Sequence, residues 1–230
     1  MTIASELKAE VDIIFSRKWD TRNGQIVPDS EDIKLGNDAV KIDGTVLYAD
    51  ISDSTNLVKD FKDFFAAEVY KAFLHCAAKI IRSEGGTITS YDGDRVMAVF
   101  IGDNKSTSAV RASLKINYSV KNIINPALKR QYGKTDFELR QTVGIDRSTL
   151  FVSRTGIRGS NDLVWVGRAA NYAAKLTELS PDYPTWITDS VYNVLQKSAK
   201  IGNGTSMWEA RTWTKMNNHS IYRSSWWWEI

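Results

Sequence analysis

The sequence predicts an α+β fold of the ferredoxin-like kind, with the element order β-α-β-β-α-β and added strands and a helix toward the C-terminus. Residues 44–51 form an apolar run typical of a buried strand, and helical spacing of large apolar residues follows it to about residue 83. The pair Asp92-Gly93 between two β-prone runs is a strong hairpin signal. A second long helical pattern, over 106–132, then precedes further strand-like segments.

The other elements follow from the same patterns. The apolar stripe of the first long helix consists of Leu57, Phe61, Phe64, Phe65, Val69, Phe73 and Cys76. Pro126 is expected to kink or break the second helix, because proline has no amide hydrogen to donate. Later elements are expected as strands over 137–146, 149–153 and 162–167, a helix over 168–179, a strand over 184–188, a helix over 189–197 and a last strand from 220.

The chain is expected to divide at about residue 43. Residues 3–19 form a helical pattern with Leu7, Val11, Ile14 and Phe15 on one stripe, and a polar stretch follows to about Gly44. We therefore expect residues 1–43 to be an N-terminal helix and loop, and residues 44–230 to be the main folded domain.

The composition is that of an ordinary globular chain. It has 230 residues, of which 43% are apolar and 25% charged, and a formal net charge of +3. That charge is too small to indicate nucleic acid or a membrane surface as a partner. The single cysteine excludes an internal disulfide, and no apolar run approaches the ~18 residues that a membrane span needs. We therefore expect a cytoplasmic protein.

Asp50 ends the apolar strand over 44–51, and Ser52-Asp53-Ser54-Thr55 follows it almost directly. A carboxylate that emerges from a buried strand costs roughly several kcal/mol unless a cation, hydrogen-bond donors or water meet it. A metal or ligand site would explain this carboxylate. The alternative is structural, because Asp53, Ser54 or Thr55 could simply cap the helix that begins there.

Asp94 lies just past the turn of the hairpin, and a β-α-β-β arrangement makes its strand a neighbour of the strand that carries Asp50. Both carboxylates can then reach one edge of the sheet and share divalent cations. An oxygen-only site of this kind suits Mg²⁺ or Mn²⁺, and two ions ~3.5–4 Å apart can support phosphoryl chemistry. The alternative is that Asp94 belongs only to an Asp-Gly-Asp turn, where aspartate is common.

Four segments, taken in order, resemble the class III nucleotidyl cyclases. They are VLYADISDST, GGTITSYDGDRVMAVF, TVGID and VWVGRAANYAAKL, and the resemblance covers about residues 44–180. One matching segment would mean little, whereas four in order at workable spacing are specific. The resemblance implies that residues 44–230 are a nucleotidyl cyclase catalytic domain, which converts a nucleoside triphosphate to a cyclic monophosphate and pyrophosphate.

The resemblance also implies how the substrate is held. The metal site falls on Asp50, Ile51 and Asp94, with two divalent cations, Mg²⁺ or Mn²⁺, as cofactors. The backbone after the first aspartate is expected to hold phosphates at a helix N-terminus, where N–H groups point outward. This substrate-binding stretch contains Ser52, Asp53, Ser54 and Thr55.

Two further residues receive catalytic roles from the resemblance. An amide for the ribose falls on Asn171, and a cation for the transition-state phosphate falls on Lys175, four residues later on the same helical face. The family usually has arginine at the second position, so lysine leaves a point charge without bidentate contact. Because sites of this family form between subunits, the resemblance implies a homodimer with two shared sites. The family's C-terminal phosphate lysine has no clear match, with Lys215 and Arg223 as unranked candidates.

The base-reading positions depart from the purine-selective pattern. Purine-selective members carry lysine or glutamate three residues before the glycine of the Gly-Asp pair, and aspartate or cysteine three before the glycine of the fourth segment. Here those positions hold Ser90 and Val164. Tyr48 and Trp165 are nearby aromatic residues that could narrow the pocket for a smaller ring. The structural alternatives are that Ser90 fills a strand, Val164 belongs to the core and both aromatic residues only pack.

A small stand-alone cyclase without the purine pattern resembles the bacterial pyrimidine cyclases of Pycsar antiphage defence. Those enzymes make cyclic UMP or cyclic CMP on infection, and a separate effector responds to the product. We expect a pyrimidine cyclase, with a weak preference for UTP over CTP. Two alternatives stay open, an adenylate or guanylate cyclase with an atypical base pocket and an inactive nucleotide-binding module that regulates a partner.

Overall fold

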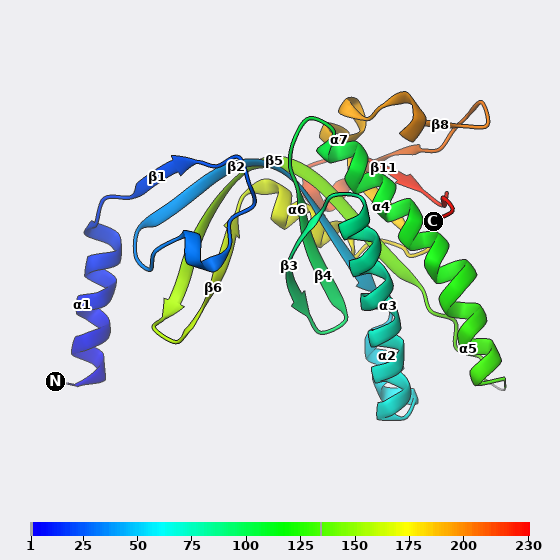
Figure 1. Cartoon of the computed structure of the whole chain (residues 1–230), viewed down its shortest axis with the longest axis horizontal. Helices are drawn as coiled ribbons and strands as arrows, with labels where there is room; N and C mark the ends of the chain where they lie inside the picture. Colours follow the sequence, from blue (N-terminus) through cyan, green and yellow to red (C-terminus); the bar gives the residue numbers. More distant parts are fainter. Residues whose placement is uncertain (1, 134) are drawn as a thin grey trace.

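Two long strands lie at the centre of the main sheet in the computed structural model, which describes residues 2–133 and 135–230. Strands β2 (Asp38–Ile51) and β5 (Gln141–Ile157) pair antiparallel without a break, from Ala39 opposite Ser153 to Ile51 opposite Gln141. Figure 1 shows them curving across the molecule, with strand β6 below them on the left and the β3–β4 hairpin below them on the right. The other elements are arranged around this pair.

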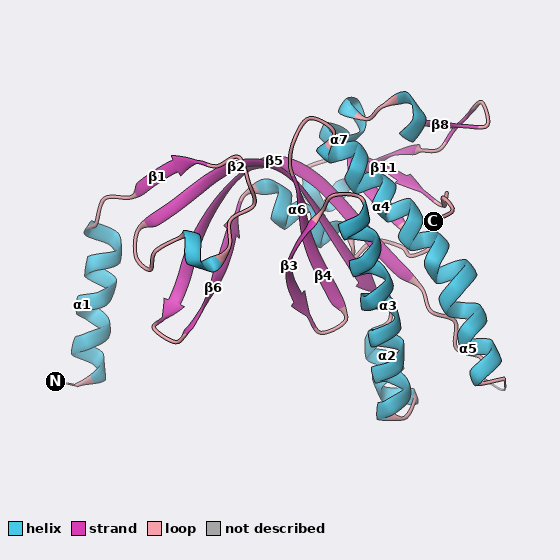
Figure 2. Cartoon of the chain, viewed as in Figure 1, coloured by secondary structure: helices cyan, strands magenta, loops and turns pink. Residues whose placement is uncertain are grey.

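The main sheet has the strand order β10-β11-β7-β5-β2-β4-β3. Figure 2 shows the strands in magenta and the helices in cyan. Its remaining strands are β3 (Thr87–Asp92), β4 (Arg95–Phe100), β7 (Thr185–Thr188), β10 (Glu209–Trp213) and β11 (His219–Ser224). Off this path, β1 (Asp20–Asn23) pairs with β2 and β6 (Ser160–Val166) pairs with β5. A separate small sheet joins β8 (Ile201–Gly202) to β9 (Thr205–Ser206).

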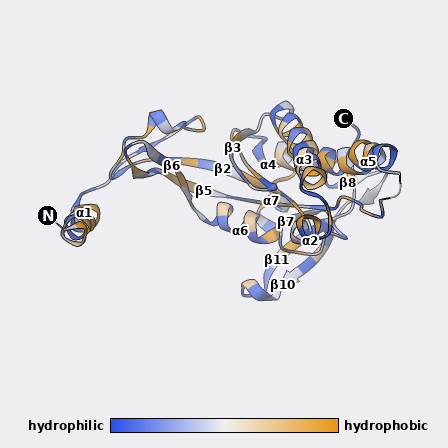
Figure 3. Cartoon of the chain, turned by 90° about the horizontal axis from the view of Figure 1, so that it is seen from below, coloured by the Kyte–Doolittle hydropathy of each residue, from blue (hydrophilic) through white to orange (hydrophobic). Residues whose placement is uncertain are grey.

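Helices cover both faces of the sheet, and the alternation of side chains along β2 explains why. Leu47, Ala49 and Ile51 face the core beneath α3 (Asp63–Ser83) and α4 (Lys105–Ser119). The intervening residues of β2 face the opposite cluster, which includes Ala169 and Ala173 of α6 (Arg168–Leu176). Figure 3 shows α3 and α4 on one side of the sheet and α6 on the other. The expected α+β fold is therefore confirmed.

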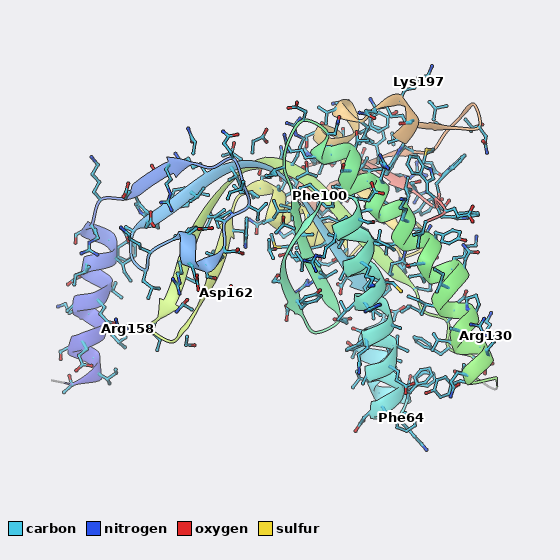
Figure 4. The ribbon with its side chains drawn as sticks, viewed as in Figure 1. Phe64, Phe100, Arg130, Arg158, Asp162 and Lys197 are labelled. Atoms are coloured by element: carbon cyan, nitrogen blue, oxygen red, sulfur yellow. The ribbon has the colours of Figure 1, made fainter. Side chains whose placement is uncertain are left out.

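The long helices are interrupted where aromatic packing or proline demands it. The first divides into α2 (Ser54–Asp60) and α3, because Phe61 turns inward to stack on Phe65 at 4.9 Å. Phe64 does not join the expected buried stripe, since it is 56% exposed at the outer end of this helix pair (Figure 4). In the second, a π-helical segment, η2 (Val120–Ile124), separates α4 from α5 (Asn125–Gln131), in which Pro126 occupies the first turn.

The expected loop before Gly44 is wrong, because β2 already begins at Asp38 and β1 and a short 3₁₀ turn, η1 (Ser30–Asp32), precede it. A division at residue 43 would therefore cut through a strand. The polar residues of this segment suggested a loop, but they belong to a strand with one exposed face. Lys41 and Asp43 point outward, whereas Ala39, Val40 and Ile42 are buried.

Similarly, the strands expected over 137–146 and 149–153 are a single strand, β5, in which polar residues occupy the middle. Near the C-terminus, α7 (Asp189–Val194) and η3 (Lys197–Ala199) replace one expected helix, and β11 ends at Ser224 rather than at the last residue.

Helix α1 (Ile3–Ser16) forms where it is expected but buries none of its residues. It stands apart from the sheet in Figure 1, and its apolar stripe, including Phe15 at 85% exposure, faces outward. The side chain of Asn37 anchors its last turn by donating to the carbonyl oxygens of Ile14 and Arg17. Of the helices in the described ranges, none is long and apolar enough to cross a membrane.

Gly144 should be intolerant of any side chain. A Cβ at this position of β5 would lie 2.1 Å from the carbonyl oxygen of Ala173 and 2.7 Å from Leu176 Cβ, so α6 would have to move. We expect Gly144→Ala to destabilise the fold by about 1–3 kcal/mol. Gly133→Ala is the matched control, because its Cβ would meet only Lys129 O at 3.7 Å. Chemical denaturation of both variants checks this, and equal stabilities would contradict the close contact.

Candidate active site

Asp50 lies on β2 directly opposite Arg95 of β4, and Tyr48 lies opposite Met97, so these four side chains share one face of the sheet. This is the face that α6 covers. Thr177, just past the end of α6, donates its hydroxyl hydrogen to Asp50 Oδ2 at 3.4 Å. The carboxylate is therefore half-buried between the sheet and the end of a helix.

Asp94 is in the β3–β4 turn and is close enough to affect the ionisation of Asp50. Burial is the main cause that raises the pKa of Asp50 from 3.8 to about 6, and the negative charge of Asp94 adds to it. Arg95 and the hydrogen bond from Thr177 oppose the shift without cancelling it. A half-buried carboxylate with a second carboxylate nearby is an arrangement that a divalent cation would stabilise. We predicted from the sequence that Asp50 and Asp94 lie near each other at one edge of the sheet, and the structure places them so.

Arg95 belongs to this cluster although the sequence reasoning did not single it out. Its guanidinium lies 5.5 Å from the centre of the Tyr48 ring and donates to Asp92 Oδ2 at 2.9 Å. Its Nε is buried without a hydrogen-bond partner among the described residues. A signal was present, since a cation opens the otherwise apolar strand RVMAVF directly after Asp94.

The turn after β2 has an uncommon backbone geometry. Asp53 adopts the left-handed conformation, with φ 60° and ψ 28°, at the N-cap of α2, and its side chain makes no capping bond. The capping alternative is therefore not realised through Asp53. Its carbonyl oxygen accepts from the amides of Asn56 and Leu57, which leaves Ser54 and Thr55 in the first turn, where amides have no intrahelical partner.

Not all of the expected phosphate-binding stretch is available. The amide of Ser52 donates to Arg140 O at 2.9 Å, and Ile51 pairs with Gln141 in the sheet. Tyr70 of α3, which we did not predict from the sequence, lies close enough to this turn for Ser54 and Asp94 to act on its ionisation. Burial and the charge of Asp94 raise its pKa. Only the fold could reveal this contact, because Tyr70 sits beside the apolar stripe of α3 without a motif of its own.

Asn171 and Lys175 do not meet Asp50 of their own chain. They lie exposed on one stripe of α6, whereas Ala173 and Leu176 are buried against the sheet on the opposite stripe. The Lys175 ammonium lies 3.8 Å from Met216 Sδ. One chain therefore presents a carboxylate pair and an amide–cation pair on surfaces that point in different directions.

The residues expected to face the base are only partly gathered. Ser90 of β3 lies opposite Met97, in the same cross-strand row as Tyr48. Val164 of β6 is 39% exposed and points away from the cluster, whereas its neighbour Trp165 packs against the cluster that Tyr48 also joins. The core alternative for Val164 is therefore wrong, and Trp165 is the residue of this pair that shares the environment of Tyr48.

Lys215 and Arg223, the two candidates for a C-terminal phosphate contact, differ in their surroundings. Arg223 is engaged, because it lies 3.5 Å from the centre of the Tyr183 ring and pairs with Glu209 at 3.0 Å. Lys215 is exposed and directly precedes Met216, which Lys175 touches. The structure favours Lys215.

A metal ion at this site would need ligands from more than side chains. Across residues 2–133 and 135–230, no three His, Cys, Asp or Glu side chains gather into a cluster that could hold an ion. Asp50 and Asp94 supply two carboxylates, and Ile51, the last residue of β2, carries the next backbone carbonyl along the chain. Mg²⁺ and Mn²⁺ commonly bind through one or two carboxylates with water and substrate phosphates, so the residues present fit such ions.

Comparison with known proteins shows which proteins this chain resembles. The chain is 52% identical over 231 residues to the uridylate cyclase of Xanthomonas perforans and 50% identical over 232 residues to that of Burkholderia cepacia, covering all of both relatives. A guanylyl cyclase crystal structure superposes with a TM-score of 0.67 at 16% identity, over 82% of this chain and 94% of that one. A bacterial light-regulated adenylyl cyclase gives 0.67 at 19% identity, over 81% and 51%. No protein-family profile matches the sequence.

The raised pKa of Asp50 makes the stability of the metal-free protein depend on pH. Its folded pKa of about 6 exceeds the usual 3.8, so the folded state keeps a proton that the unfolded chain releases, and stability falls as pH rises from about 4 to about 6. Asp50→Asn removes this penalty. We expect it to raise the melting temperature by roughly 2–4 °C at pH 8 and by less at pH 4.5.

Differential scanning calorimetry with a chelator present measures this difference. Asp103→Asn, in an exposed turn, is the control. An equal gain at both pH values would show that Asp50 is not held in its neutral form by the fold.

Proposed function

Since this chain belongs to the class III nucleotidyl cyclase family, we propose that it converts UTP to 3′,5′-cyclic UMP and pyrophosphate. The observation that carries the proposal is the carboxylate pair at one edge of the sheet, the half-buried Asp50 and Asp94, which lies close enough to act on its ionisation. The names of the relatives support uridine as the nucleoside, because three that match along nearly the whole chain are uridylate cyclases.

The reaction makes one bond and breaks one. The ribose 3′-oxygen forms a bond to the α-phosphorus and its proton passes to water. The bond from the α-phosphorus to the oxygen bridging the α- and β-phosphates breaks, and pyrophosphate leaves with that oxygen and its electron pair. Two divalent cations at Asp50, Asp94 and the Ile51 carbonyl would activate the attacking oxygen and neutralise the leaving pyrophosphate. The amides of Ser54 and Thr55 are placed to bind phosphate oxygens, with Ser52 and Asp53 shaping the turn.

The other half of the site must come from a second copy. Asn171 and Lys175 point away from the sheet that carries their own Asp50, so the carboxylates of one subunit would meet the amide and cation of its partner. Asn171 would orient the ribose and Lys175 would neutralise charge on the transferring phosphate. Lys215, next to the residue that Lys175 touches, would add a second phosphate contact. A homodimer with two sites follows.

The side chains near the expected base position favour a small ring. Tyr48, with the Arg95 guanidinium 5.5 Å from its ring centre, shares a cross-strand row with Ser90 and would narrow a pocket formed there. Ser90 carries no charge with which to read a purine edge, and Val164 points away from this cluster. The Arg95 guanidinium carries donors that a base carbonyl would accept from.

The cellular role is part of the same proposal. The resemblance to Pycsar cyclases supports cyclic UMP as an intracellular signal in antiphage defence, which acts through a separate effector. Whether CTP is also a substrate is decided by the first experiment below.

The product from a mixture of nucleotides tests the substrate. With equal UTP, CTP, ATP and GTP and Mn²⁺, we expect mass spectrometry to find cyclic UMP as the main product, and a chelator to abolish it. A dominant cyclic CMP would change the pyrimidine, whereas a dominant cyclic purine nucleotide would overturn the pyrimidine assignment and leave the cyclase assignment intact.

Mixed dimers test the shared site. Asp50→Ala and Asn171→Ala should each lower turnover by about 100-fold or more as homodimers, because each removes a different half of both sites. Mixing them should restore one intact site per mixed dimer. Asp103→Ala is the control for a carboxylate outside the site. No recovery, with subunit exchange shown by differently tagged chains, would contradict a site shared between subunits.

A further inference from the structure

Asp146 is a fully buried carboxylate in the middle of β5, and the proposed chemistry does not use it. Burying a charge is costly unless donors surround it. Here four donors do: Arg168 through Nε at 3.0 Å and Nη2 at 3.2 Å, Thr188 through its hydroxyl at 2.5 Å, and Ser190 through its hydroxyl at 2.9 Å. The carboxylate therefore ties together a strand, the start of α6 and the junction of β7 with α7.

Arg168 carries this tie to the helix that bears the catalytic residues. It is the first residue of α6, and Asn171 and Lys175 follow three and seven positions later, on the same helical stripe. Its guanidinium also donates to Arg147 O and to Ser190 Oγ, each at 2.9 Å. These bonds on one side chain tie the first residue of α6 to β5 and to the first turn of α7.

Further contacts hold the same end of the helix. The amide of Ala169 donates to Ser148 Oγ at 3.0 Å, so the backbone of the first turn is also bonded to β5. Tyr172, beside Asn171, has the Arg168 guanidinium 5.5 Å from its ring centre and the Trp213 ring edge-on at 5.6 Å. In the first turns of α6 the sheet side offers small residues, Ala169 and Ala173, whereas Leu176 packs against the sheet at the last turn. The start of the helix would therefore be able to turn if its first residue were released.

We propose that the Asp146–Arg168 pair positions Asn171 and Lys175 for catalysis, and that Asp146 is a positioning residue of the subunit that supplies these two side chains. This inference rests on the proposed shared site. A buried ion pair adds little net stability compared with apolar packing but imposes one geometry, because each lost donor leaves a charge unpaired. A displacement of about 1 Å in groups that orient the reacting atoms can cost about 100-fold in rate.

The test uses the mixed dimer with a single intact site, in which the Asp50→Ala chain supplies Asn171 and the Asn171→Ala chain supplies Asp50. Asp146→Asn placed on the Asp50→Ala chain should lower kcat about 10-fold or more with KM within about 3-fold. The same change on the Asn171→Ala chain should leave kcat within about 2-fold. A purely structural defect would act from either chain, so equal losses would overturn the proposal.

Two variants keep the result interpretable. Glu84→Gln removes another buried acid, which pairs with Arg111 at 3.0 Å and Lys115 at 2.7 Å between α3 and α4, and it should lower the melting temperature without the kcat loss. Arg168→Lys keeps the positive charge but loses the paired donors, and it should give a smaller kcat loss of the same sidedness. A kcat loss for Asp146→Asn no larger than for Glu84→Gln would also overturn the proposal.

If the mixed dimer without the Asp146 change fails to recover activity, the shared site of the proposed function is wrong. The positioning role of Asp146 is then tested separately, by measuring kcat of variants in which both subunits carry the same changes. Asp146→Asn and Asn171→Ser should then combine to less than the product of their separate kcat losses, because one acts through the other. Losses that multiply would overturn the positioning role independently of the dimer.

Discussion

The unbroken pairing of β2 with β5 is the interaction on which the rest of the structure depends. It holds Asp50 at the edge next to Arg95, and it places Gly144 where α6 can approach the sheet closely. The same strand carries Asp146 two residues further on, in reach of the first residue of that helix. A slip of one residue in this pairing would turn each of these side chains to the other face of the sheet.

The second constraint is the orientation of α6. Its apolar residues, Leu176 included, approach the sheet closely because Gly144 has no side chain, and this leaves Asn171 and Lys175 facing outward. A helix of nine residues cannot present its polar stripe to the same sheet that buries its apolar stripe. The proposed division of the site between two subunits therefore follows from how this one helix packs, and in our proposal the buried Asp146 carboxylate sets the rotation of that helix.

Much of the fold could be read from periodicity and turn residues. The apolar run that ends at Asp50, the hairpin at Asp92-Gly93 and the break near Pro126 all have local causes, so a single sequence was sufficient. The misread segments were those in which polar residues lie inside strands, before Gly44 and around Asp146, because alternation with buried neighbours is weaker than a continuous apolar run. Likewise, Tyr70, Arg95 and Thr177 joined the site only through contacts between distant segments.

The sequence by itself determined which residues with functional side chains the chain has and on which local elements they lie. It gave one carboxylate at a strand end and one in a hairpin turn, and an amide and a cation on one helical stripe. It also showed that the expected base positions, Ser90 and Val164, carry no charge. Only the tertiary structure decided which of them meet. Burial and the approach of Asp94 set the pKa of Asp50, and the packing of α6 turned Asn171 and Lys175 away from it. Electrostatic coupling and helix rotation depend on distances across the sheet, which a pattern along the chain does not encode.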